Sequence, residues 1–247
     1  MIENQWLREG ERFDDLERSG LLIIQNPSKF CFGMDAVLLS GFAKVKPGEN
    51  VLDLGTGTGI IPLLLSAKSQ GKHFVGLEIQ EDMADMAWRS VQANGLEEKI
   101  RILCGDIKSV EEILPVGSFS VVTSNPPYMN DLHGIKNPDS ALAIARHEVL
   151  CTLEDIIKSA AKMLKSNGKF FMVHRPHRLV EIMEWMSKYK LEPKRMCFVH
   201  PYADKEANMV LIEAAKGGGH FLKLEPAMVV YERPGVYTKQ LLEIYGY

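Results

Sequence analysis

The chain has 247 residues, 46% of them hydrophobic, which suits one sizeable packed domain and excludes a disordered or fibrous protein. No run approaches the roughly 20 apolar residues that span a bilayer, and the charged segment 1–20 has no apolar signal core, so we expect a cytoplasmic protein with no membrane partner. The net charge is only −3, and the four scattered cysteines form no CxxC pair, which argues against a disulfide framework and a zinc site.

Two short strands and a helix are expected ahead of the main pattern. The runs Leu21–Gln25 and Lys29–Phe32 flank Asn26-Pro27-Ser28, which is a turn sequence, and Met34–Ala43 is typical of a helix. These elements belong to a segment of about 48 residues, which we expect to act as an N-terminal extension (1–48).

From Asn50 onward, short apolar runs alternate with longer amphipathic stretches, which indicates repeated βα units and a parallel sheet. The expected strands are Val51–Leu54, His73–Glu78, Ile100–Cys104, Phe119–Ser124 and Lys169–His174. The expected helices are Gly59–Lys68, Met83–Asn94, Leu153–Leu164, which Asn167-Gly168 should end, and Leu179–Lys188. Arg195–Val199 and Asn208–Glu213 should close the sheet as an antiparallel pair. We expect residues 49–216 to form the core and 217–247 a C-terminal extension of the same single domain.

A glycine-rich loop, Asp53-Leu54-Gly55-Thr56-Gly57-Thr58-Gly59, follows the first core strand. Its three glycines let the backbone turn sharply and approach a ligand without interference from a Cβ atom, so a cofactor is expected at the carboxyl edge of the sheet. The spacing does not fit the dinucleotide pattern GxGxxG. No lysine follows until Lys68, which argues against a Walker-type phosphate loop.

Two more carboxylates follow the next strands. Glu78 ends the second core strand, where it can accept hydrogen bonds from both hydroxyls of a ribose. Asp106 follows the third strand, where it can accept from an adenine amino group. A single acid in such a position is often only a helix N-cap, but three acidic strand ends together with the glycine loop favour a nucleoside-bearing ligand.

This loop resembles the D-x-G-x-G-x-G motif of class I S-adenosylmethionine-dependent methyltransferases, whose cofactor carries a sulfonium and an amino-acid tail in place of a pyrophosphate. The resemblance implies a Rossmann-like α/β fold, with a mostly parallel seven-stranded sheet flanked by helices. It implies S-adenosyl-L-methionine as the cofactor and S-adenosyl-L-homocysteine as its product. The cofactor-binding residues that it implies are Asp53, Gly55, Thr56, Gly57, Gly59, Glu78, Ile79, Asp106, Ile107 and Asn125.

The tetrapeptide Asn125-Pro126-Pro127-Tyr128 directly follows the fourth core strand. It resembles the motif of methyltransferases that act on the amino groups of adenine or cytosine or on glutamine amides, and this implies that all four residues are catalytic. A conjugated exocyclic amine is a poor nucleophile because its lone pair is delocalised. The Asn125 side-chain carbonyl and the Pro126 main-chain carbonyl can accept its two hydrogens and direct the lone pair toward the methyl group.

The other two residues of the tetrapeptide shape the acceptor site. The prolines fix φ and remove N–H donors, so carbonyl groups dominate the polar surface of the turn. Tyr128 offers a flat face on which a planar base can stack. Such a base must first leave its helical stack, so a loop or flipped nucleotide is expected as the substrate.

As a whole, the chain most resembles the small tRNA adenine-N6 methyltransferases that modify the purine beside the anticodon of a valine tRNA. The resemblance implies N6-methylation of that adenine, with tRNA as the partner. The segment Lys29–Leu39 is similar to the family's segment before the glycine loop, which implies that Phe32 and Asp35 help to close the cofactor site. Asp35 can equally be a first-turn residue of a helix with no such role.

Three other activities stay open. Release-factor glutamine methyltransferases share the tetrapeptide but carry a preceding helical domain, for which the 49 residues before the core leave little room. Ribosomal guanine-N2 methyltransferases often have Phe in the fourth position and an added domain. The third alternative is not an enzyme: it is a noncatalytic module that binds cofactor and RNA. The intact glycine loop and Asn125 count against this alternative.

Charge is distributed unevenly along the chain. Residues 1–135 carry 12 Lys/Arg and 19 Asp/Glu, whereas residues 136–247 carry 17 and 13, so a basic face for phosphates is as plausible as a set of solvated helix flanks. His174, Arg175 and Arg178 follow the fifth core strand and are candidate RNA contacts.

The polar segment Asn130–Ala141 resembles a mobile substrate loop. His133 and His147 show no ligand spacing, so no metal is expected.

Overall fold

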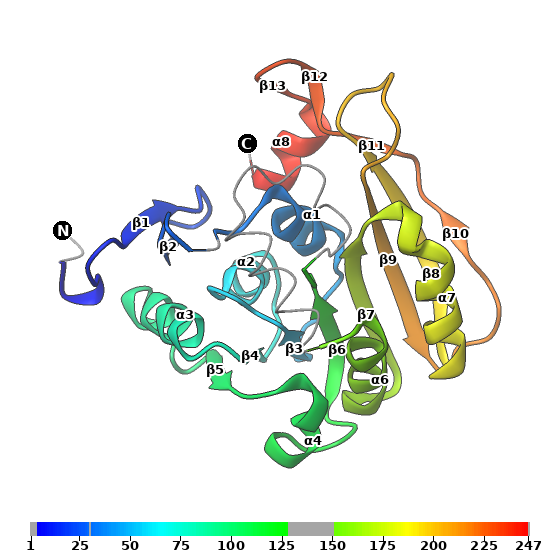
Figure 1. The fold of residues 1–247 in the computed structure, drawn as a ribbon, viewed down its shortest axis with the longest axis horizontal. Helices are drawn as coiled ribbons and strands as arrows, with labels where there is room; N and C mark the ends of the chain where they lie inside the picture. Colours follow the sequence, from blue (N-terminus) through cyan, green and yellow to red (C-terminus); the bar gives the residue numbers. More distant parts are fainter. Residues whose placement is uncertain (1–3, 30, 128–150, 247) are drawn as a thin grey trace.

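A central sheet with helices on both faces forms the body of the protein (Figure 1). The computed structural model describes residues 4–29, 31–127 and 151–246. Within them the sheet has nine strands. Eight of them follow one another in the spatial order β10 (Lys223–Leu224), β8 (Leu191–His200), β9 (Met209–Lys216), β7 (Leu164–His174), β6 (Phe119–Ser124), β3 (Asn50–Leu54), β4 (His73–Glu78) and β5 (Ile100–Cys104). The ninth strand, β11 (Met228–Val229), also pairs with β8. β9 is antiparallel to β7 and β8, and the other pairs are parallel. The seven longer strands are the predicted mostly parallel sheet, which β10 and β11 widen at one edge.

Helices cover the two faces of this sheet and explain why its inner strands β3 and β6 are almost entirely buried. One face packs on α1 (Met34–Phe42), α2 (Ile60–Lys68) and α3 (Glu81–Ala93), and the other on α4 (Val110–Ile113), α6 (Leu153–Met163) and α7 (Leu179–Lys188). All six residues of β6 are buried, as expected for a strand covered on both faces. None of the helices within the described residues is long and apolar enough to cross a membrane.

The start of β7 differs from its prediction. The strand begins at Leu164, directly after α6, so the expected helix end at Asn167-Gly168 is wrong. Phe119 and Val121 of β6 pair with Leu164 and Lys169 of β7, and the additional β7 residues are taken up by an irregularity in which Asn167 has a φ of 61°. Asparagine tolerates this left-handed conformation better than most residues, and here it serves a strand irregularity and not a helix stop.

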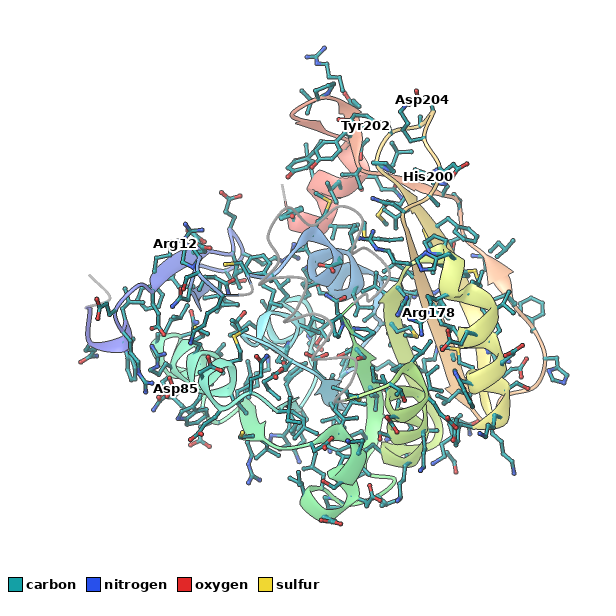
Figure 2. The ribbon with its side chains drawn as sticks, viewed as in Figure 1. Arg12, Asp85, Arg178, His200, Tyr202 and Asp204 are labelled. Carbon is teal, nitrogen blue, oxygen red and sulfur yellow. The ribbon has the colours of Figure 1, made fainter. Side chains whose placement is uncertain are left out.

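The N-terminal extension forms a separate hairpin of β1 (Arg12–Asp15) and β2 (Leu22–Gln25), preceded by the short helix η1 (Asn4–Trp6). The predicted strand Lys29–Phe32 is wrong, because the chain turns there: the Lys29 N–H donates to the Asn26 carbonyl at 2.9 Å. The hairpin lies along α3, on which Asp85 is labelled in Figure 2. The Arg89 guanidinium of α3 donates to both carboxylate oxygens of Glu11, at 2.6 and 2.8 Å.

The C-terminal extension packs on the core. It contains the pair β12 (Tyr231–Arg233) and β13 (Val236–Tyr237) and the helix α8 (Lys239–Tyr245), which lies beside α1 (Figure 1). The fit between the two helices is close: a Cβ atom on Gly41 would lie 2.6 Å from Ile244 Cγ2. The rings of Tyr231, Tyr237 and Tyr245 stack in a row, with successive centroids 5.1 and 6.1 Å apart. The row therefore joins β12, β13 and α8 within the extension.

Candidate active site

Four neighbouring strands end at one edge of the sheet, and each leads into a predicted site segment. β6, β3, β4 and β5 are parallel neighbours in that order, with Ser124 paired with Leu54 and Glu78 paired with Cys104. The carboxyl ends of parallel strands meet at the same edge of a sheet. The Asn-Pro-Pro turn, the glycine loop, Glu78 and Asp106 therefore gather at this edge.

The glycine loop leaves β3 in a series of left-handed backbone conformations. Gly55, Gly57 and Gly59 have φ angles of 74°, 55° and 84°, which residues with a side chain rarely adopt. The N–H groups of Gly55 and Thr56 donate to the Leu77 carbonyl at 2.9 and 3.0 Å, so the loop folds over the end of β4. A Cβ atom on Gly57 would meet no heavy atom within 4 Å, which leaves open space beside the loop backbone.

Glu78 fixes the shape of this loop. Its side chain is buried, one carboxylate oxygen accepts the Gly57 N–H at 2.9 Å, and the other accepts the Gln80 N–H at 3.0 Å. The oxygen that accepts the Gln80 N–H also accepts the Gln80 side-chain amide at 3.4 Å, whereas the oxygen that accepts the Gly57 N–H can still accept a further hydrogen bond. The contact of Glu78 with ribose hydroxyls stays a prediction, and the structure adds a role in holding the loop.

Asp53 and Thr56 provide unsatisfied polar atoms next to the loop. Asp53 is 1% exposed, and its Oδ1 accepts a hydrogen bond from the Thr123 hydroxyl at 2.6 Å. Burial raises the pKa of Asp53 to about 6, and the Thr123 bond and the nearby Thr56 hydroxyl oppose this only in part. Among the described residues, Asp53 Oδ2 and Thr56 Oγ1 are buried with no partner in hydrogen-bonding geometry. Buried polar atoms of this kind call for a ligand or an ordered water, so these residues fit a polar cofactor.

Asp106 and the two predicted isoleucines also lie at this edge. Asp106 caps the short helix η2 (Ile107–Ser109), where its Oδ1 accepts the Lys108 N–H at 2.9 Å. The capping role that the sequence allowed is therefore present, and the adenine contact stays a prediction. Ile107 Cδ1 lies 3.9 Å from the position of a Cβ atom on Gly55, so Ile107 borders the glycine loop. Ile79 is half-buried directly after β4.

The Asn-Pro-Pro turn continues directly from β6. Asn125 is half-buried, Pro126 is buried and Pro127 is exposed. The Ser124 hydroxyl, itself fully buried, donates to the Leu54 carbonyl at 2.9 Å, which fixes the last residue of β6 to the last residue of β3. The turn and the glycine loop therefore start from positions that are joined by a side-chain hydrogen bond.

The residues at and just after the end of β7 are less accessible than the sequence suggested. His174 is 2% exposed, and its Nδ1 accepts the Arg175 N–H at 2.8 Å. Burial and the nearby Arg178 lower the pKa of His174 to about 4, so the ring is neutral near pH 7. This placement corrects the expectation that His174 meets RNA phosphate. Arg178, labelled in Figure 2, ends the short helix η4 (Pro176–Arg178) and pairs with both carboxylate oxygens of Glu181 at 2.6 and 2.9 Å.

Many of the other basic residues in the second half of the chain are also paired with carboxylates. Lys162 pairs with Glu111 and Lys188 with Glu154, while one buried carboxylate, Glu213, binds two cations. These ion pairs favour the interpretation as helix and strand flanks over a continuous basic face. The RNA contacts of Arg175 and Arg178 stay predictions.

Phe32 and Asp35 lie where the chain enters α1. The Phe32 N–H donates to the Gln25 side-chain carbonyl at 3.1 Å, and the Phe32 side chain lines a small cavity with Leu64 and Tyr245. Asp35 is in the first turn of α1, where its Oδ1 accepts the Ala36 N–H. Phe32 is thus linked to the glycine loop through Gln25, which also contacts Thr58.

Several predicted features fall outside the part of the chain that the structure describes. They are Tyr128, the expected substrate loop Asn130–Ala141, His133 and His147. Within the described ranges, no three His, Cys, Asp or Glu side chains form a group that could hold a metal ion.

Sequence analysis missed four residues that shape this edge: Gln25, Gly76, Thr123 and Ser124. A Cβ atom on Gly76 would lie 2.8 Å from Thr56, so only glycine leaves room for the loop there. Thr123 and Ser124 are adjacent polar residues at the carboxyl end of a fully buried strand, and this was a usable signal. Gln25 carried no local signal, because its partners are distant in the sequence.

Comparison with known proteins agrees with this geometry. The protein-family model of the methyltransferase small domain matches residues 33–189. The tRNA1(Val) (adenine(37)-N6)-methyltransferase of Porphyromonas gingivalis is 31% identical over 188 residues, which cover 73% of this chain and 72% of that protein. The protein of the same name from Bacteroides thetaiotaomicron is 31% identical over 72% of this chain and 69% of its own.

A solved structure shows the same fold. The predicted O-methyltransferase from Agrobacterium tumefaciens superposes with a TM-score of 0.70 over 86% of this chain and 95% of that protein, at 22% sequence identity. The architecture is therefore the Rossmann-like class I methyltransferase fold that the sequence predicted. From the family match and the two relatives, the chain belongs to the methyltransferase small domain family.

Proposed function

We propose that this protein transfers the methyl group of S-adenosyl-L-methionine to N6 of an adenine in RNA, the adenosine 3′ of the anticodon of a valine tRNA. The observation that carries the proposal is the meeting of the glycine loop and the Asn-Pro-Pro turn on the neighbouring strands β3 and β6, joined by the Ser124–Leu54 hydrogen bond. The names of the relatives from Porphyromonas gingivalis and Bacteroides thetaiotaomicron support the choice of acceptor.

The cofactor would be held between the glycine loop and the ends of β4 and β5. S-adenosylmethionine supplies an electrophilic methyl group on a sulfonium. The open side of Gly57 accommodates its approach to the backbone, Glu78 accepts from its ribose, and Asp106 accepts from its adenine. The unsatisfied atoms of Asp53 and Thr56 provide acceptors or donors for its polar tail.

The acceptor amine would be held by the turn after β6. The Asn125 side-chain carbonyl and the Pro126 main-chain carbonyl accept its two hydrogens, which favours a tetrahedral nitrogen with its lone pair directed at the methyl group. No strong base is needed before transfer, because the proton can leave after the new bond forms. Tyr128 would stack on the base, and Arg175 and Arg178 would contact phosphates near it.

Mass spectrometry of nucleosides from cells with and without the gene tests this proposal. We expect N6-methyladenosine to disappear from tRNA and not from ribosomal RNA when the gene is deleted, and to return with the wild-type gene but not with an Asn125→Ala gene. An unchanged nucleoside profile together with an unmethylated release factor would instead assign the protein to glutamine methylation. For a protein that modifies tRNA, we expect the cytoplasm as its place of action.

A further inference from the structure

Gln25 is the one fully buried polar side chain of β2, and β2 is outside the main sheet. Its side chain is 0% exposed, and it ends the hairpin that lies along α3. A buried carboxamide is costly unless its hydrogen-bonding groups are satisfied. The partners of Gln25 therefore indicate why an amide occupies this position.

Those partners come from two different segments. Gln25 Nε2 donates to the Thr58 hydroxyl of the glycine loop at 2.7 Å and to the Ile24 carbonyl at 3.1 Å. Gln25 Oε1 accepts the Phe32 N–H at 3.1 Å, in the segment that leads into α1. Both amide hydrogens and the carbonyl are thus used, and a single side chain joins the N-terminal extension to the loop.

The glycine loop needs such contacts because glycines give it little intrinsic preference for one shape. The core supplies two of them, the Leu77 carbonyl and the Glu78 carboxylate, which hold Gly55, Thr56 and Gly57. Gln25 supplies the contact at Thr58, which is 2% exposed. Thr58, in the half of the loop nearest α2, is therefore held by a side chain from outside the core.

The hairpin that carries Gln25 is itself held in place. The Ile24 N–H donates to the Ser90 hydroxyl, and the Leu22 N–H and carbonyl bond to the Asn94 side chain, at 2.9, 2.9 and 2.6 Å. The hairpin therefore has its own anchors on α3, and these anchors do not involve the glycine loop. A loop that is already in its binding shape binds more tightly, since binding does not have to order it.

We propose that Gln25 is a positioning residue of the cofactor site: through Thr58 it holds the glycine loop in its binding conformation, and through Phe32 it fixes the segment that leads into α1. This inference rests on the proposed function, since it assumes that the loop binds S-adenosylmethionine. It assigns to the N-terminal extension a role in cofactor affinity and not in the chemical step.

Calorimetric titration of the full chain with S-adenosylhomocysteine tests the inference. We expect Gln25→Ala to raise the dissociation constant roughly fivefold to tenfold, the usual effect of one lost buried hydrogen bond. In turnover assays, KM for S-adenosylmethionine should rise by a similar factor, with kcat at saturation within about twofold of the wild type. A purely structural role of Gln25 would not produce this split.

Asn94→Ala is the matched control, because it loosens the same hairpin on α3 without touching the loop. We expect it to lower the melting temperature but to leave the dissociation constant of the folded protein within about twofold. If both variants weaken binding equally, Gln25 only stabilises the hairpin and the proposal is wrong. The proposal is also wrong if Gln25→Ala binds as the wild type does.

Thr58→Val tests the same bond from its other end and leaves the hairpin intact. It should weaken binding by a similar factor, and the Gln25→Ala/Thr58→Val double variant should be no weaker than either single one, because the two changes remove one interaction. Additive losses would contradict the link. If the wild type itself does not bind S-adenosylhomocysteine, the proposed function fails; if it binds and the two single variants bind as well, only the present inference fails.

Discussion

The glycine loop after β3 and the Asn-Pro-Pro turn after β6 lie on neighbouring strands, yet they are held in different ways. The loop is held by groups from other segments: the Leu77 carbonyl, the Glu78 carboxylate and the Gln25 amide. The turn has two prolines, whose φ is fixed covalently, and it is anchored through the residue before it, Ser124.

This difference separates the two tasks of the site. A network of distant side chains sets the shape of the loop, so changes in the network should mainly alter affinity for the cofactor. The geometry of the turn is largely local, so a change of Asn125 should mainly alter the rate of transfer. Single substitutions can therefore perturb one region without the other.

The largest effect is expected from Asn125→Ala. The variant loses the side-chain carbonyl that accepts an amino hydrogen, and losing one such preorganised group costs roughly 10²–10³-fold in kcat. Its dissociation constant for S-adenosylhomocysteine should stay within about threefold of the wild type. Single-turnover methyl transfer to tRNA and calorimetry measure the two quantities. An affinity loss as large as the rate loss would mean that the turn and the loop are not separable.

Two buried groups near the carboxyl edge of the sheet, Asp53 in β3 and His174 at the end of β7, should make the stability of the protein depend on pH in opposite directions. The pKa of Asp53 is raised to about 6, so its contribution to stability is complete below its ordinary pKa of 3.8 and is lost as the pH rises through 6. The pKa of His174 is lowered to about 4, so its contribution is present above its ordinary pKa of 6.5 and is lost as the pH falls through 4.

Urea unfolding between pH 4 and pH 7 separates these contributions. Relative to the wild type, Asp53→Asn should gain stability as the pH rises, and His174→Gln should gain stability as it falls, each by up to about 3 kcal/mol at 1.36 kcal/mol per pKa unit. If the difference in stability between a variant and the wild type does not change with pH, the pKa of the replaced Asp53 or His174 is not shifted by burial as described.

A smaller effect is expected from Glu78→Gln. The carboxylate accepts the N–H groups of Gly57 and Gln80, and hydrogen bonds to a charged group contribute about 1.5–3 kcal/mol. We expect the dissociation constant for S-adenosylhomocysteine to rise roughly tenfold to a hundredfold, with kcat at saturation changed much less. Glu81→Gln, on the exposed first turn of α3, is the control and should bind as the wild type does. If the two variants weaken binding equally, the loss of a negative charge, and not the loss of the contact between Glu78 and the loop, explains the lower affinity.

The smallest effect is expected from Ser124→Ala, which removes the buried bond between the ends of β6 and β3. The free energy of unfolding should fall by about 1 kcal/mol, and the transfer rate should fall a few-fold because the turn and the loop lose their direct link. Ser118→Ala removes a hydroxyl bond of similar length within one turn, to the Pro115 carbonyl, and should lower stability without changing the rate. A rate unaffected by Ser124→Ala would show that strand pairing alone aligns the two regions.

The parallel core could be predicted from the sequence because its strands are short, mostly apolar runs that alternate with amphipathic helices, and the inner strand β6 is buried along its whole length. β4, β5 and β6 have the predicted bounds, and the glycines identified the loop through their conformational freedom. The expected antiparallel closing pair is also present, as β8 and β9.

The features that failed depend on contacts between segments distant in the sequence. Arg12–Asp15 is charged and has no strand pattern, and it becomes β1 only by pairing with β2. Lys29–Phe32 is partly apolar, but its described residues, Lys29, Cys31 and Phe32, pair with no strand in the part of the chain that the structure describes. His174 looked like a cation for phosphates, yet the packing around the end of β7 buries it and keeps it neutral. Gln25 is an ordinary polar residue until the fold brings Thr58 to it.

The most direct test of the account is a crystal structure of the full chain with bound S-adenosylhomocysteine. The account predicts the ligand against Gly55–Gly59, with its ribose on the Glu78 carboxylate and the Asn125 side chain facing the sulfur. A ligand bound elsewhere, or an Asn125 side chain directed away from the sulfur in every copy, would contradict it.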